Sequence, residues 1–176
     1  SSIPVVNGVS WELASYRKKS ISNLNYKMEV TIPSIPSVPI TGTTEFTFNL
    51  TDISQDIQID FKADKDQKKS VRANGKRQQI NHYNEHISIT RNALNIGENK
   101  IKIKYVAGDD ALNRSVNFLY TLFVRDRMRT SFPSFDQPNL KATFELTLKV
   151  PESWETMSSA PIARESSRNL KKTVRF

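Results

Sequence analysis

The stretch 142–150 reads Ala-Thr-Phe-Glu-Leu-Thr-Leu-Lys-Val, and every second residue in it is apolar. Successive side chains of a strand point to opposite faces, so this period of two predicts a β-strand with one buried face. The same alternation recurs at 43–50, 57–61 and 101–105. The chain is therefore predicted to consist largely of strands that bury one face and expose the other.

Turn residues separate these runs. Asn74-Gly75 is typical of a type I′ hairpin turn, which needs positive φ at both central residues. Three prolines between positions 33 and 39 interrupt the chain before the next strand. The one helical stretch that the pattern favours is a turn or two around 11–18.

These elements predict an all-β fold, an antiparallel two-sheet β-sandwich. The strand expected at 117–124 is apolar on both sides, which predicts a central position covered on both faces. The length of 176 residues indicates one domain. We expect it to span 9–176, to be truncated at its C-terminal end, and to follow a flexible leader at 1–8.

The composition excludes several kinds of site. The chain has no cysteine and only two histidines, His82 and His86. Disulfides, thiolate metal sites and cysteine nucleophiles are therefore excluded. No apolar run approaches the roughly 18–20 residues that cross a bilayer, so no membrane span is predicted.

The net charge of +8 raises the question of nucleic-acid binding. Residues 62–77 carry seven basic and two acidic side chains, and residues 164–175 carry five and one. Grooves for nucleic acid interleave basic groups with aromatic rings on which bases stack, and neither stretch contains an aromatic residue. We therefore predict solvated loops there and no nucleic-acid partner.

His82, Glu85 and His86 spell H-x-x-E-H, the pattern of inverted zinc peptidases. That chemistry needs a helix, on which the two imidazoles share a face. On a strand the two histidines would lie roughly 13 Å apart, and the motif leads directly into an alternating run at 87–90. Chance loop residues are favoured over a metal site, and we assign no catalytic or metal-binding residue.

The most informative segment is 126–151, which reads Asp-Arg-Met-Arg-Thr-Ser-Phe-Pro-Ser-Phe-Asp-Gln-Pro-Asn-Leu-Lys-Ala-Thr-Phe-Glu-Leu-Thr-Leu-Lys-Val-Pro. Its central prolines restrict the backbone, and Phe132 and Phe135 offer large apolar anchors. Asp136 can accept backbone N–H bonds within the turn. The residues predict a rigid aromatic–proline turn that leads into the long strand.

This segment resembles the signature near the end of the N-terminal domain in zinc aminopeptidases of the aminopeptidase N family, approximately D-A-R-R-x-F-P-C-F-D-E/Q-P-x-L-K-A-x-F-x-L. Residues 8–17, 40–50 and 107–114 also resemble that family, particularly its bacterial branch. The resemblance covers about residues 8–176. It implies that the chain folds as the saddle-like N-terminal β domain of such an enzyme.

The chain departs from the family at several positions. Ser134 stands where the signature has a cysteine. Leu122 and Val124 stand where the family commonly carries Gln or Glu that reach the amino end of the substrate, and they cannot bind an ammonium group. Either the register of these residues against the family pattern is shifted, or this branch binds its substrate in a different way. We therefore assign no substrate-binding residue. HExxH and the GAMEN-like loop are missing, which predicts a non-catalytic fragment without the catalytic domain.

The resemblance implies a parent protein that removes N-terminal residues from peptides, with a zinc-bound water as nucleophile and zinc held outside this chain. It implies that this domain packs on its own catalytic domain and helps to wall the active-site cavity. The residues do not indicate where the parent is located; an exported, periplasmic location is a guess that rests only on the bacterial branch that the chain resembles. Three charged residues are candidate polar links across the junction, with solvated or intradomain pairing as the open alternative. The interdomain or structural motif comprises Arg129, Phe132, Pro133, Phe135, Asp136, Gln137, Pro138 and Lys141, of which Arg129, Asp136 and Lys141 are the three candidate links.

A stand-alone β-sandwich adhesion or ligand-binding module is the alternative. It would need an exposed binding surface, such as aromatic side chains around Trp11 or Trp154. Residues 169–176 alternate weakly as a basic strand, and a strand without its neighbour leaves backbone groups unpaired. We therefore expect either weak self-association through this edge or fraying of the chain after about Trp154.

Overall fold

The computed structural model describes residues 2–35, 37–62, 68–106, 132–152, 164–168 and 171–175, with the backbone alone at 68–69, 164–168 and 171–175. Its strands form an eight-stranded sheet in the order β10-β11-β9-β1-β2-β8-β4-β5 and a three-stranded sheet in the order β3-β7-β6. The elements are α1 (Trp11–Ser20), β1 (Ile21–Thr31), β2 (Thr41–Leu50), β3 (Ile57–Asp60), β4 (Lys68–Ala73), β5 (Lys76–Gln78), β6 (Asn81–Tyr83), β7 (His86–Ile89), the 3-10 turn η2 (Arg91–Ala93), β8 (Gly97–Val106), β9 (Ala142–Pro151), β10 (Arg164–Arg168) and β11 (Lys171–Arg175).

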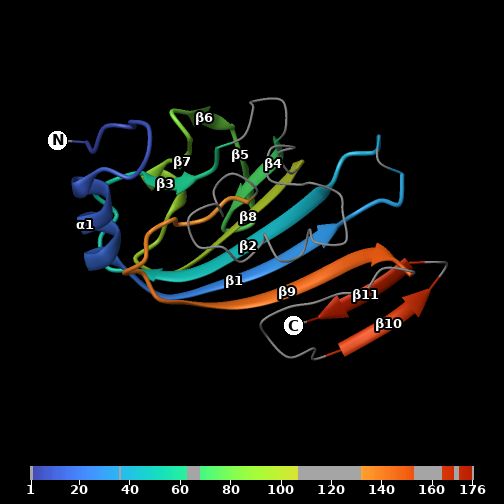
Figure 1. Ribbon diagram of the computed structural model, residues 1–176. Coiled ribbons are helices and arrows are strands. Elements are labelled where there is room, and N and C mark those ends of the chain that lie inside the picture. The colour runs from blue at the N-terminus through green and yellow to red at the C-terminus, as the bar shows by residue number, and fades with distance from the viewer. Residues whose placement is uncertain are drawn as a thin grey trace.

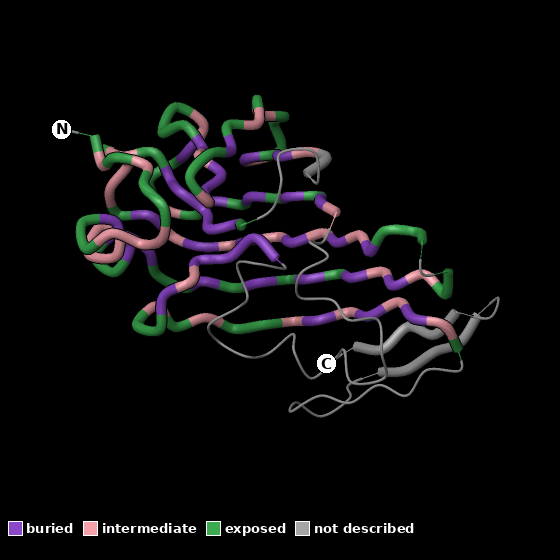
Figure 2. Tube along the Cα trace, turned by 45° about the horizontal axis from the view of Figure 1, so that its top comes forward, coloured by how far each residue is buried: buried purple, intermediate pink, exposed green. Residues whose placement is uncertain are grey.

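The two sheets share one hydrophobic core. In Figure 1 the small sheet lies over one end of the large sheet, and α1 lies beside it at that same end. Along β1, β2 and β8 buried residues alternate with more exposed ones, as the changing colours of Figure 2 show. The rings of Phe61, which follows β3, and Tyr105 of β8 meet edge to face at 5.5 Å and join the two layers. The predicted all-β, two-sheet architecture is confirmed.

One strand pairing differs from the antiparallel prediction. β9 lies parallel to β1, with Leu24 opposite Ala142 and Thr31 opposite Lys149. Alternation predicts which face of a strand is buried but not the direction of its neighbour. A parallel neighbour requires a connection of a dozen or more residues, and β9 follows β1 by far more than that. The large sheet is therefore mixed, and the small sheet is antiparallel.

The hairpin predicted at Asn74-Gly75 joins β4 to β5. The two residues have φ values of 50° and 81°, in the left-handed region that a type I′ turn requires. The expectation of solvated loops in the two basic stretches is wrong for their described parts, because these form the hairpins β4–β5 and β10–β11. On β4 and β5 the basic residues Arg72, Lys76 and Arg77 are exposed, which a strand with one face in water accommodates. β11 pairs with both β9 and β10, so the prediction that the strand at 169–176 lacks a neighbour is wrong for its described part. The strand expected at 117–124 lies outside the described residues.

The helix α1 is longer than the predicted turn or two. Ser10 is its N-cap, and the Ser10 hydroxyl accepts a hydrogen bond from the Leu13 N–H at 3.2 Å. Basic residues fill its last turn, where they offset the negative end of the helix dipole. Lys18 and Lys19 are exposed, whereas Arg17 is buried. No helix among the described residues is long and apolar enough to cross a membrane.

Candidate functional site

Residues 132–141, here called the signature segment, lie between the small sheet and the inner face of the large sheet. Asp60 of β3 and Ser134 exchange two backbone hydrogen bonds of 2.8 and 2.9 Å. The segment divides into a buried and a more exposed part, and Arg129 lies outside the described residues. Phe132, Pro133, Phe135 and Gln137 are buried, Asp136 is half-buried, and Pro138 and Lys141 are exposed.

Phe135 anchors the segment to the large sheet. Its ring meets the rings of Phe46 and Phe48 edge to face, at centroid distances of 5.7 and 5.9 Å. Its backbone N–H donates to the Tyr26 hydroxyl at 2.9 Å. Aromatic pairs of this geometry add stability beyond that of the buried area alone. The aromatic anchor predicted from the sequence is thus part of the core.

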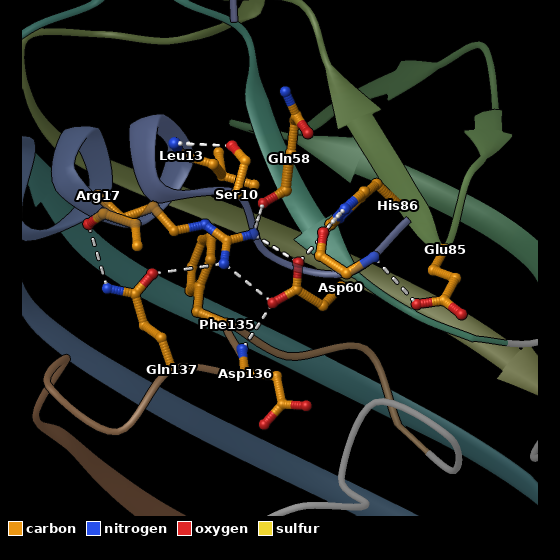
Figure 3. Close-up of polar contacts among 12 residues, drawn as sticks. Ser10, Leu13, Arg17, Gln58, Asp60, Glu85, His86, Phe135, Asp136 and Gln137 are labelled. Carbon is orange, nitrogen blue, oxygen red and sulfur yellow. Dashed lines mark hydrogen bonds and ion pairs between the residues drawn. The ribbon is translucent and has the colours of Figure 1, made fainter. Parts of the chain in front are cut away.

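A buried carboxylate, Asp60, holds the other side of the segment (Figure 3). Its Oδ1 lies 2.6 Å from Nη2 of Arg17 and 2.8 Å from Nδ1 of His86. Its Oδ2 accepts hydrogen bonds from Nη1 of Arg17 at 2.9 Å and from the backbone N–H of Asp136 at 2.7 Å. Both carboxylate oxygens therefore have two close partners, from three different parts of the chain.

The partners of Asp60 keep it ionised. Burial by itself would raise the pKa of Asp60, but the hydrogen bond with His86, the charge and hydrogen bonds of Arg17 and the N–H of Asp136 together lower that pKa below its usual value. Arg17 and Asp60 are each only 1% exposed. A buried pair of this kind is costly to break, because removing one partner leaves an uncompensated charge inside the protein.

Arg17 extends the cluster to the rest of the signature segment. Its Nη2 donates to the backbone oxygen of Gln58 at 2.6 Å, and its Nη1 lies 3.4 Å from Oε1 of Gln137. Gln137 in turn donates to Oδ1 of Asn139 at 2.7 Å. The guanidinium carbon also lies 5.1 Å from the ring centroid of Phe135, within cation–π range. Arg17 thus joins α1, β3 and the signature segment.

The N-terminal residues are attached to the same cluster through His86. Its Nε2 lies 3.0 Å from the backbone oxygen of Val6 and 2.7 Å from that of Gly8. The Ile3 N–H donates to Oε1 of Gln55 at 2.8 Å, and Oε2 of Glu85 accepts from the Gly8 N–H at 3.2 Å. In the structure, the segment expected to be a flexible leader makes these contacts with His86 of β7, with the turn before β7 and with Gln55 before β3.

The H-x-x-E-H motif lies on β6, a turn and β7 rather than on a helix or a loop. His82 is buried, and its Nε2 lies 2.6 Å from the backbone oxygen of Phe61. His86 is buried beside Asp60, as described above. Within the described ranges, no group of three or more His, Asp or Glu side chains is placed to hold a metal ion. These histidines serve the packing of the small sheet.

Sequence reasoning missed Arg17 and Asp60 as members of the candidate site. Asp60 occupies an outward position in the alternating run at 57–61, which normally predicts exposure. All four residues of β3 are nevertheless buried. The second face of β3 is covered by α1 and the N-terminal segment. The alternation within β3 does not predict this cover. The one sequence feature that could have indicated this ion pair is Arg17, the single arginine in the helix expected at 11–18.

Comparisons with known proteins identify the family of the chain. The family model of the Peptidase M1 N-terminal domain matches residues 22–176. The chain belongs to that family. Aminopeptidase N of Streptomyces lividans is 50% identical to it over 44 residues, which are 25% of this chain and 5% of the relative. Rice aminopeptidase M1-D is 38% identical over 60 residues, 34% of this chain and 7% of the relative.

Solved structures of M1 proteins share the fold. The M1 zinc metallopeptidase of Deinococcus radiodurans superposes with a TM-score of 0.64 at 18% identity, over 89% of this chain and 38% of that protein. At this identity the likeness establishes the fold alone. The chain spans well under half of this M1 structure and a small fraction of the curated relatives it matches. The predicted membership in an M1 N-terminal domain family is confirmed.

Proposed function

We propose that this chain is the non-catalytic N-terminal domain of a zinc-dependent aminopeptidase, and that it packs on the parent's catalytic domain and helps to wall the active-site cavity. Membership in the M1 N-terminal domain family supports the first part. The solved relatives are M1 zinc metallopeptidases of which a domain like this one makes up about two fifths, 38% in one case. Peptides would be the substrates of that parent.

The proposed packing on the catalytic domain rests on the signature segment, which has one buried side and one exposed side. Its inner side is held by Phe135 and by the cluster around Asp60, so the segment has a defined position. Its outer side presents Pro138 and Lys141 to solvent. Phe144, the next aromatic residue, is 51% exposed although its ring stacks on Tyr26 at 4.7 Å. We assign this exposed side to the junction with the catalytic domain.

Zinc would be held by the rest of the parent. The two histidines of the described residues do not fit the ion, because both contact backbone oxygens. His86 also contacts the carboxylate of Asp60. No three-ligand group exists in the described part of the chain. The domain therefore contributes shape and position rather than a metal ligand.

The test compares the 176-residue chain with the longer parent protein that the proposal requires, expressed from the full gene. We expect the longer product to release the N-terminal residue of a peptide and to contain zinc, and the 176-residue chain to do neither. In the longer product, Phe144→Ser should weaken the junction and lower its unfolding temperature. Thr143→Ser, on the neighbouring exposed position, is the matched control. Peptide hydrolysis by the 176-residue chain itself would overturn the proposal.

The alternative of a stand-alone adhesion or ligand-binding module retains one supporting observation. Trp11 is 82% exposed on α1, as such a surface would require. Trp154 lies outside the described residues. A natural gene product that ends near residue 176 and binds a ligand through Trp11 would favour this alternative.

A further inference from the structure

Six charged side chains form one row across the outer face of the large sheet. Residues directly opposite each other on neighbouring strands share a face of the sheet. The signs alternate over the first four strands, and the last three members of the row are all cations. From β9 to β5 the register places Glu145, Lys27, Glu45, Lys102, Arg72 and Arg77 in this order.

Two further lysines widen the cationic end of this row. Lys100 and Lys104 lie two residues on either side of Lys102 on β8, so they share its face. The five exposed cations of this region, here called the basic face, are Lys100, Lys102, Lys104, Arg72 and Arg77. The bordering acids are Glu45, whose Oε1 is 3.8 Å from Nζ of Lys100, and Glu98 further along β8.

The other half of the same face is arranged differently. Lys27 lies between Glu145 and Glu45, and Nζ of Lys149 is 2.7 Å from Oε1 of Glu29. On the basic face, by contrast, Arg72 is directly opposite both Lys102 and Arg77. Like charges directly opposite each other destabilise a sheet. An anionic partner would remove that repulsion.

The backbone beneath the basic face is firmly held. The alternate residues of β8 and β4, including Ile101, Ile103 and Val71, point into the core and are at most 1% exposed. Cations two residues apart on a strand are about 7 Å from each other, and neighbouring strands are about 4.8 Å apart. The basic face can therefore meet several anionic groups of one surface at once.

We propose that the basic face binds the surface of an anionic phospholipid bilayer. Clusters of four to eight lysines and arginines beside a membrane helix or on an amphipathic helix bind anionic headgroups. The basic face presents five such cations, here on strands of a sheet. Nucleic acid is the less favoured partner, because the outward positions of β1, β2 and β8 hold no aromatic residue on which a base could stack. The contact is peripheral, and it goes beyond the proposed role in the aminopeptidase.

The test is co-sedimentation of the 176-residue chain with vesicles of phosphatidylcholine, alone or mixed with an equal part of phosphatidylglycerol. We expect binding to the mixed vesicles only, weakened when salt is raised from about 0.05 to about 0.5 M, because salt screens charges on both surfaces. Replacing Arg72, Arg77 and Lys102 together by Ser should weaken binding by about tenfold or more, since each cation near an anionic surface contributes several-fold.

A matched variant removes the same charge elsewhere. Lys18, Lys19 and Lys27 are exposed and lie outside the basic face, and replacing these three by Ser should leave most of the binding intact. Equal loss in both triple variants would mean that net charge alone acts, which overturns the proposal. Failure to distinguish the two vesicle types overturns it as well. So does tighter binding, at the same salt, to a DNA duplex or a single-stranded oligonucleotide.

Discussion

Strands β3 and β8 have the same period of two in the sequence, yet the lysines of β8 are exposed and the polar residues of β3 are buried. On β8 the lysines at 100, 102 and 104 face water. On β3, Gln58 and Asp60 occupy the corresponding polar positions and are buried. The difference comes from the second layer of cover: α1 and the N-terminal residues contact β3 through Arg17 and Ile3.

This comparison shows what alternation can and cannot reveal. It predicts the apolar face of a strand, because that face must be removed from water. It does not predict whether the polar face is covered, since that depends on segments far away in the sequence. Where the polar face is covered, each polar group needs a partner inside the protein. Asp60 meets this condition with Arg17, His86 and the N–H of Asp136.

The largest expected effect is at Asp60. Asp60→Ala leaves Arg17 charged and buried without its carboxylate, so it should lower the free energy of unfolding by about 3–5 kcal/mol. On β8, Lys102→Ser should change it by less than about 0.5 kcal/mol, as exposed sites do. Urea unfolding of both variants measures the difference. Equal midpoints would show that the two strands do not differ in the way described here.

A double variant sharpens this test. Replacing a buried ion pair by apolar groups is often much less costly than breaking it. Arg17→Met combined with Asp60→Ala should therefore be more stable than Asp60→Ala alone. A double variant that is less stable by the full sum of the single losses would indicate that the two side chains act independently.

An effect of similar size is expected at Phe135, which covers the inner face of the large sheet. Phe135→Ala removes a ring packed on Phe46 and Phe48, and large-to-small changes of this kind cost about 3–5 kcal/mol. Leu140 is only half-buried at the end of the same segment, so Leu140→Ala should cost clearly less. Thermal unfolding of the two variants compares them. A smaller loss for Phe135→Ala would contradict its role as the anchor.

Much of the fold could be predicted from the sequence for a simple physical reason. Burial of Phe46, Ile101 and Leu148 follows directly from the period of two, and the turn at Asn74-Gly75 follows from its need for positive φ. These are local properties, which each segment shows by itself.

The rest depends on contacts between distant segments. The parallel pairing of β9 with β1 joins residues more than a hundred positions apart. In the candidate site, the sequence predicted Phe132 and Phe135 as apolar anchors and both are buried, whereas Arg17 and Asp60 were missed. Their hydrogen bonds link α1 to β3 across 43 positions, and no pattern within either element indicates that pairing.

A smaller effect is expected at Gly42, where the inner face leaves no room for a side chain. A Cβ atom at this position would lie 2.6 Å from the ring of Tyr105, the residue directly opposite on β8. Gly42→Ala should therefore cost about 1–3 kcal/mol, as overpacking of a core does. Thr43→Ala, on the outer face of the same strand, is the control and should cost less. Equal losses would show that Tyr105 moves aside freely.

The smallest effect is expected in the dependence of stability on pH. Because the pKa of Asp60 is lowered by its partners in the folded state, the folded protein binds this proton less readily than the unfolded chain does. The stability that Asp60 contributes is thus present above the usual carboxyl pKa of about 4 and is lost as the pH falls through the lower folded value. Asp60→Asn should accordingly flatten the fall of stability on the acid side, measured by urea unfolding between about pH 5 and pH 2. If Asp60→Asn kept the acid slope of the unchanged protein, the buried carboxylate on β3 would not be a source of the pH dependence.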